Sequence, residues 1–207
     1  MARGDGGFSV PSRVRAMPSV TLGATEAAEL CGAAYVAGLQ DCRVLLPRGT
    51  GHLAGDVRHG LPVVRSAQLV GRLGTELVVP TVALTPDAAD AAGRPVGRVT
   101  DVPVVVATGD RDELAAVGAA VSQPTGWLDE IAYIESAQQL DGVRREAEER
   151  ATAMVMANGA APGTTYLVES SSVAVPYSPS GTVRLRVRVA GASEAAAGHR
   201  RTAGAAR

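Results

Sequence analysis

The spacing of apolar residues along this chain changes between the period of a helix and the period of a strand, and this alternation limits the possible folds. Over residues 26–39, 112–121 and 141–158, small and apolar residues recur every three or four positions, as on one buried face of a helix. Over 183–189, valine and leucine occupy every second position, as in a strand with one buried face. Helices and strands that alternate along a chain predict an α/β fold.

The N-terminal part of the chain predicts a β-hairpin around a glycine-bearing turn. The turn is Arg48-Gly49-Thr50-Gly51-His52, and extended stretches flank it on both sides. The strands predicted here lie over 41–46, 56–64, 77–82 and 102–107. The last of them is apolar throughout, which favours burial on both faces of a sheet. Threonine, proline and an acid at 85–87 predict a helix over 86–92.

The C-terminal part predicts a long amphipathic helix followed by extended segments. Gly159 is placed to end the helix over 141–158. The extended segments lie over 128–134, 166–169, 172–176 and 183–189, with a turn signal at 178–181. In the last strand Arg184, Arg186 and Arg188 share one face. They could hold an anion, but a solvated outer face is the favoured interpretation.

Composition narrows the classes of function. The chain has 207 residues, a formal net charge of −1 and no lysine, so nothing indicates a surface for nucleic acid. Cys31 and Cys42 stand in no zinc or redox spacing, and inert thiols are expected. No window approaches the ~20 apolar residues of a membrane span, and the N-terminus has no apolar leader, so we expect a cytoplasmic protein.

Segments spread over most of the chain resemble, in the same order, those of the hydantoinase/oxoprolinase family. The segments that carry the resemblance are MPSVTL (17–22), GAAYVAGLQD (32–41), GRLGTE (71–76), LTPDAADAAGR (84–94), DVPVVV (101–106), AVGAAVS (116–122), GWLDEI (126–131) and PYSPSGTVRLRV (176–187). Members of this family use ATP to open cyclic amides such as hydantoins and 5-oxoproline, on the fold shared by actin, heat-shock chaperones and sugar kinases. No single motif decides the resemblance; the shared order carries it.

The resemblance implies a partial ribonuclease-H-like domain with a mixed sheet, flanking helices and a C-terminal β-hairpin. This domain is expected over 21–191, after an N-terminal extension over 1–20. The Ala/Gly/Arg-rich tail over 192–207 has almost nothing to bury and is expected to be disordered. Family members are several times longer, so a second lobe would have to come from another chain.

The resemblance also implies a site for ATP and magnesium, and this sequence departs from it. The two acids of the family's phosphate loop are replaced by Leu46 and Leu53, which cannot coordinate a hard cation. Backbone amides of a Gly-rich turn could still approach an anion. The residues that remain as candidates for the nucleotide are Gly49, Thr50, Gly51 and Gly109. Asp56 is the candidate replacement ligand for the metal.

Three functions follow as hypotheses. The first is a non-catalytic member of the family, or pseudoenzyme, that acts as an accessory subunit of a full-length partner. The second is an ATP-dependent hydrolase of cyclic amides whose second lobe a partner chain supplies, with phosphate at the turn and metal at Asp56. The third is a small module that binds an anionic metabolite through the turn and the arginine strand.

Overall fold

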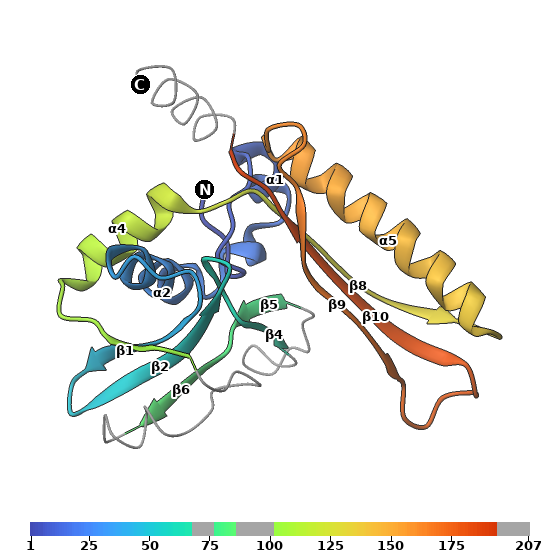
Figure 1. Cartoon of the computed structure of the whole chain (residues 1–207), viewed down its shortest axis with the longest axis horizontal. Coiled ribbons are helices and arrows are strands. Elements are labelled where there is room, and N and C mark those ends of the chain that lie inside the picture. The colour runs from blue at the N-terminus through green and yellow to red at the C-terminus, as the bar shows by residue number, and fades with distance from the viewer. Residues whose placement is uncertain (68–76, 86–101, 194–207) are drawn as a thin grey trace. The chain divides into compact units, whose positions relative to one another are not determined.

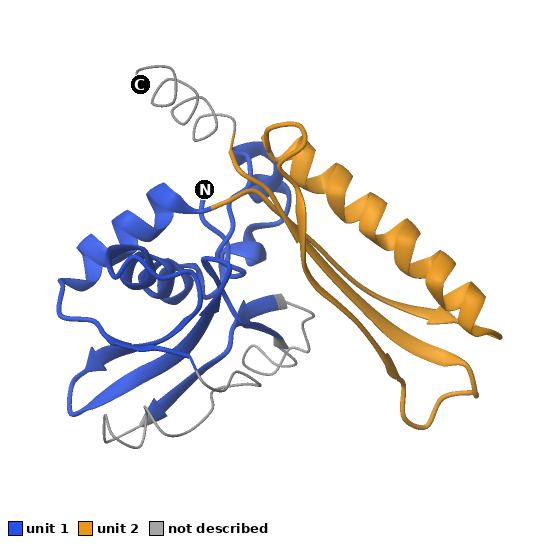
Figure 2. Cartoon of the chain, viewed as in Figure 1, with its two compact units in different colours: residues 1–122 blue, residues 123–207 orange. Residues whose placement is uncertain are grey.

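The computed structural model of the chain describes residues 1–67, 77–85 and 102–193 (Figure 1). The chain divides into two compact units, Met1–Ser122 and Gln123–Arg207 (Figure 2). The boundary between the units falls inside the segment predicted to be a single domain. The segment predicted as an N-terminal extension belongs to unit 1, where Asp5, Ser9 and Val14 are buried.

Unit 1 contains a mixed sheet covered by two helices. Its elements are α1 (Pro11–Ala16), the 3-10 helix η1 (Pro18–Thr21), α2 (Ala24–Val36), β1 (Cys42–Arg48), β2 (Gly51–Arg58), β3 (Leu61–Pro62), β4 (Val64–Ala67), β5 (Leu77–Pro80), β6 (Val82–Thr85), β7 (Val104–Val106) and α4 (Arg111–Val121). Among the described residues the main sheet has the order β3-β2-β1-β7, and β6 also pairs with β2. Strand β2 runs antiparallel to β1, β3 and β6, whereas β7 runs parallel to β1. The predicted hairpin and the mixed sheet are therefore both present.

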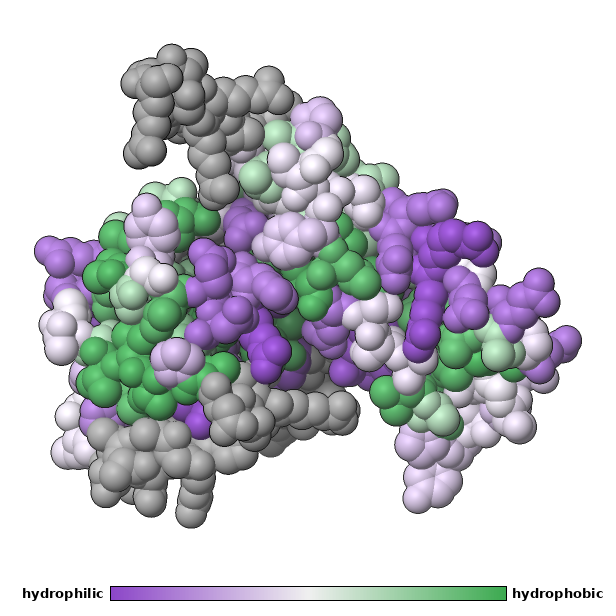
Figure 3. All heavy atoms as spheres, in the orientation of Figure 1, coloured by the Kyte–Doolittle hydropathy of each residue, from purple (hydrophilic) through white to green (hydrophobic). Residues whose placement is uncertain are grey.

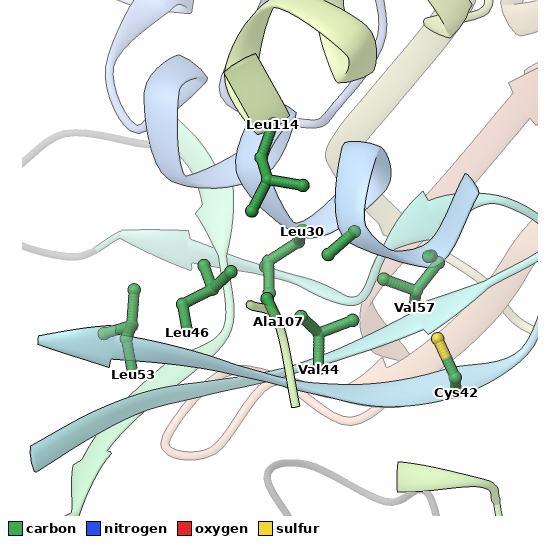
Figure 4. Close-up of a cluster of buried hydrophobic side chains, with 10 residues drawn as sticks. Leu30, Cys42, Val44, Leu46, Leu53, Val57, Ala107 and Leu114 are labelled. Carbon is green, nitrogen blue, oxygen red and sulfur yellow. The ribbon is translucent and has the colours of Figure 1, made fainter. Parts of the chain in front are cut away.

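The core of unit 1 lies between α2, α4 and one face of the sheet (Figure 4). It is built from small and aliphatic side chains, as expected for a chain with 3% aromatic residues. Its members are Leu30, Ala33, Ala34, Cys42, Val44, Leu46, Leu53, Val57, Ala107 and Leu114. Burial of each leucine or valine contributes about 1.5–3 kcal/mol. The apolar stripe predicted over 26–39 is confirmed for Ala27, Leu30, Cys31 and Ala34, but Tyr35 in the last turn of α2 and Ala37 at its C-cap are exposed.

Helices α2 and α4 approach each other at two glycines. A Cβ atom at Gly32 would lie 2.0 Å from the carbonyl oxygen of Leu114, and one at Gly118 would lie 1.8 Å from that of Ala28. Both distances are far below contact distance, so no side chain fits at either position. The two glycines therefore set the spacing of the helices.

Two predictions for unit 1 need revision. The prediction that 102–107 is buried on both faces is wrong, because β7 lies at the end of the described sheet and its Val104 and Val106 are 42% and 51% exposed. The strand predicted over 77–82 is divided into β5, which pairs with β4, and β6, which pairs with β2. The helix predicted over 86–92 lies outside the described residues.

Unit 2 is a three-stranded antiparallel sheet with one long helix on one face. Its elements are β8 (Thr125–Tyr133), α5 (Ala137–Ala157), β9 (Tyr166–Ala174) and β10 (Thr182–Ala190). The order of the strands is β8-β10-β9, and β9 with β10 forms the predicted C-terminal hairpin. The core on the helix side contains Ala147, Ala151, Val155, Ala160, Leu185, Val187 and Val189. No helix in the described part of the chain is long and apolar enough to cross a membrane.

Candidate functional site

The β1–β2 turn contains three of the residues predicted to contact a nucleotide. Gly49 and Thr50 are exposed, and Gly51 pairs with Arg48 at the first rung of the hairpin. Gly49 has a φ of +54°, in the left-handed region where glycine carries no steric penalty. No atom lies within 4 Å of a Cβ built at Gly49. The turn is therefore open, but by itself it supplies no charge that would hold a ligand.

Gly109 reaches the same edge of the sheet through β7. Because β7 is parallel to β1, with Val106 beside Leu45, both strands end at this edge. Gly109 follows β7 and lies two residues before Arg111, the first residue of α4. The topology thus places Gly109 and the β1–β2 turn at the same end of these two strands.

A buried ion-pair cluster lies at this edge, and sequence analysis did not predict it. Glu29 of α2 is only 1% exposed. It accepts hydrogen bonds from Nε and Nη2 of Arg111, at 3.2 and 3.0 Å, and from Nη2 of Arg48. The carboxylate therefore joins α2, the end of β1 and the start of α4. The available sequence signal was a single acid within the apolar stripe of the helix, but its partners lie 19 and 82 residues away.

The N-terminus of α4 is occupied by the chain's own carboxylate. Asp110 accepts hydrogen bonds from the N–H groups of Asp112 and Glu113, at 2.8 and 3.3 Å. These are the amides that would otherwise be available to a phosphate group. Asp112 and Glu113 add two more acids to the first turn. The helix end thus carries negative charge that opposes the binding of an anion.

Leu46 and Leu53, which the resemblance aligns with the phosphate-loop acids of the family, are both part of the hydrophobic core of unit 1. They are direct partners across the β1–β2 ladder and are 1% and 7% exposed. Figure 4 shows their side chains on the helix side of the sheet, in the cluster that includes Leu114. No group of three His, Cys, Asp or Glu side chains that could hold a metal is found among the described residues. Leu46 and Leu53 therefore offer a cation only apolar side chains.

Asp56, the predicted metal ligand, is a fully buried partner of an arginine. Its two oxygens accept hydrogen bonds from Nε and Nη2 of Arg43, at 2.8 and 3.3 Å. Asp56 faces Arg43 in the β1–β2 ladder, near the end of the hairpin opposite the turn. Asp56 lies five positions along the strand from Gly51, which is roughly 16 Å of extended chain. The structure does not bring Asp56 to the turn, and the carboxylate has a structural partner where it lies.

The two cysteines are buried and unpaired by disulfide among the described residues. Burial raises the pKa of the Cys42 thiol to about 11, and the carboxylates of Asp41 and Asp56 contribute to the rise. A thiol with this pKa is almost fully protonated at neutral pH and is a poor nucleophile.

The arginine face of β10 is more than a solvated surface. Nε and Nη2 of Arg184 donate to the two oxygens of Asp129, at 2.6 and 2.8 Å, and Nε of Arg186 donates to the same carboxylate at 3.2 Å. Arg188 is 2% exposed. The solvated face is therefore wrong for Arg188, whereas Arg184 and Arg186 stay partly exposed, at 29% and 32% of their side chains, and also bind an acid of the neighbouring strand. These arginines belong to unit 2, whereas the glycine turn belongs to unit 1.

Comparisons of the chain with protein-family models, with curated proteins and with solved structures found no match.

Proposed function

We propose that this chain is a non-catalytic relative of the hydantoinase/oxoprolinase family that acts as an accessory subunit. The observation that carries the proposal is the burial of Leu46 and Leu53 in the core of unit 1. Magnesium takes oxygen ligands in near-octahedral geometry, and two opposed leucines offer none. Without a cation at this point, the charge of a triphosphate would be uncompensated.

The architecture of unit 1 is compatible with the ribonuclease-H-like domain that the resemblance implies. An antiparallel hairpin, a parallel strand beside it and helices on one face are all present. The edge where β1 and β7 end would be the phosphate side of such a domain. At this edge Glu29 already binds Arg48 and Arg111, and Asp110 already binds the amides of α4.

The alternative of a working ATP-dependent hydrolase has less support. It requires Asp56 to hold a metal near the turn, but Asp56 pairs with Arg43 and lies away from the turn. The alternative of an anion-binding module also has less support, because Arg184 and Arg186 pair with Asp129 and belong to a different compact unit from the turn.

Calorimetric titration of the full chain with ATP and magnesium tests the proposal. We expect no measurable heat of binding from a chain whose circular dichroism shows a cooperative melting transition. The matched control is Thr50→Val, which removes the hydroxyl group of the open turn without changing its size. Micromolar binding that requires magnesium and is weakened by Thr50→Val would overturn the proposal and favour the hydrolase.

A further inference from the structure

The C-terminal end of α5 carries the only asparagine of the chain. Asn158 follows the last residue of the helix. Charged side chains cover the outer side of α5, where Figure 3 shows hydrophilic surface, but Asn158 is only 1% exposed. Its Nδ2 donates to the carbonyl oxygen of Thr125 at 2.9 Å, and Thr125, the first residue of β8, is fully buried. This amide group therefore joins the end of α5 to the start of the unit 2 sheet.

The other polar atom of this side chain is buried without a donor. Oδ1 of Asn158 accepts no hydrogen bond from the described residues. A buried polar atom in this state is uncommon in a folded protein. The side chain thus meets an acceptor at Nδ2 and no donor at Oδ1. Such surroundings suit a neutral amide and exclude a carboxylate, both of whose oxygens need donors.

The fold also requires glycine at the next position. Gly159 has a φ of +91°, where any side chain would be strained. Its N–H donates to the carbonyl oxygen of Met156 at 3.0 Å, in the turn that ends α5. The hydrogen bond to Thr125 needs the amide at 158, and the turn needs glycine at 159. The fold therefore retains an Asn-Gly pair, which is chemically labile because glycine has no side chain to hinder attack by its nitrogen.

We propose that Asn158 is a site of deamidation, that the closed end of α5 suppresses the reaction, and that the product prevents this end from closing again. The backbone nitrogen of Gly159 loses its proton and bonds to Cγ of Asn158. The Cγ–Nδ2 bond breaks, and Nδ2 leaves as ammonia. Water then opens the succinimide ring at either carbonyl carbon and yields aspartate or isoaspartate. One water molecule is consumed and one ammonia is released, with no oxidation or reduction.

The closed structure holds both reacting groups away from this path. The Gly159 nitrogen keeps its proton in the hydrogen bond to Met156, and the Asn158 amide is fixed at Thr125. Both hydrogen bonds must break before the nitrogen can reach Cγ. The end of a helix opens at a lower free energy than the whole domain unfolds. The rate of deamidation in the folded chain is therefore the rate in the unfolded chain multiplied by the fraction of time that this end is open.

The product does not fit the closed structure. An aspartate is charged at neutral pH, and one of its oxygens would face the carbonyl oxygen of Thr125 where Nδ2 now donates. The other oxygen would take the place of Oδ1, where no described residue donates. An unpaired buried charge is strongly unfavourable. Isoaspartate also adds a methylene group to the backbone of the turn. The reaction is thus a one-way change that leaves the end of α5 detached from β8.

This proposal concerns unit 2 and does not depend on the proposed function. Its test uses the full chain, incubated in slightly alkaline buffer either folded or in concentrated urea, and digested with trypsin at intervals. Trypsin releases residues 151–184, which contain Asn158 and no glutamine. A mass gain of one unit in this fragment therefore comes from Asn158 alone. We expect the gain to appear at least about tenfold more slowly in the folded chain than in the unfolded chain.

Two conditions check the mechanism. Urea below the unfolding midpoint should accelerate the reaction, because it favours the open state. Asn158→Gln keeps an amide at this position but must form a larger, less favourable ring, and it should show no mass gain over the same period.

The effect of the product is measured by thermal melting of Asn158→Asp, followed by the fluorescence of Trp127 in β8. We expect a melting temperature lower by about 10 °C or more. Gln138→Glu is the matched control, since it makes the same exchange of amide for carboxylate at an exposed position of α5. It should stay within about 4 °C of the wild type. The aged wild-type chain, in which deamidated and intact molecules separate by ion exchange, gives the same comparison in a protein that has already folded.

Three results would overturn the proposal. Equal rates of deamidation in the folded and unfolded chains would show that the structure does not protect Asn158. An unchanged mass of the fragment from the unfolded chain would show that the pair is not labile. A deamidated chain that melts at the same temperature as the intact chain would show that the closed structure accepts the product.

Discussion

Replacing Asp56 with asparagine tests whether this carboxylate stabilises the fold or is retained for a metal. Asp56 is fully buried, and the side chain of its partner Arg43 is 6% exposed. The substitution leaves the guanidinium group buried with a neutral partner. Breaking a buried pair in this way typically costs about 3–5 kcal/mol. This is a large part of the ~5–15 kcal/mol that stabilises an ordinary domain.

Urea denaturation followed by circular dichroism measures this loss, and Trp127, the only tryptophan, reports separately on unit 2 by its fluorescence. The double variant Arg43→Met with Asp56→Leu is the control, and it should recover much of the lost stability because no charge remains buried. A site retained for a metal behaves in the opposite way, since neutralising an unoccupied ligand leaves stability unchanged or raises it. A loss below about 1 kcal/mol for Asp56→Asn would refute the structural role.

Two further substitutions and a titration test the packing of each unit. Gly118→Ala should destabilise unit 1 by about 3 kcal/mol or more in thermal melts, since its Cβ would lie 1.8 Å from the carbonyl oxygen of Ala28 and the helices would have to separate. Gly142→Ala should instead stabilise the chain by about 0.5–1 kcal/mol, because this helical glycine has open space around it. Equal changes in stability for the two substitutions would show that Gly118 does not set the distance between α2 and α4. Cys42 should resist alkylation at pH 8 while the protein is folded, and rapid modification would show that the thiol is not buried. Its pKa is higher in the folded state, so its contribution to stability is present below pH 9 and is lost as the pH rises towards 11.

Local pattern was sufficient to predict several elements of the fold. The spacing of Ala27, Leu30 and Ala34 defined the buried face of α2, and Gly38 follows its end with a φ of +70°. Helix α5 begins four residues before the predicted start, at Ala137, because Ser136 caps a polar first turn that has no apolar period. A serine just before a helix is itself a sequence signal for the start of that helix, because its hydroxyl group can accept a hydrogen bond from an N–H of the first turn. Here the donor is the Gln139 N–H.

The remaining features depend on contacts between distant segments. The run of valines in β7 indicated a strand but not its place at the end of the described sheet. The partners of Glu29, Asp56 and Asp129 are arginines 13 to 82 residues away. The sequence contains 20 arginines, so no pairing could be chosen without the fold. The division into two units was not predicted, because no linker of distinct composition marks residue 122.

The leucine pair at Leu46 and Leu53 has a consequence for the history of the chain, if its ancestor carried acids there. The two side chains face each other in a dry core. A single substitution back to aspartate would bury one charge with no partner and no cation, which costs several kcal/mol. Restoring a metal site would require both acids and a reopened cleft at the same time. Each step alone would lower stability before a metal could bind, so under that premise the exchange of acids for leucines would be hard to reverse.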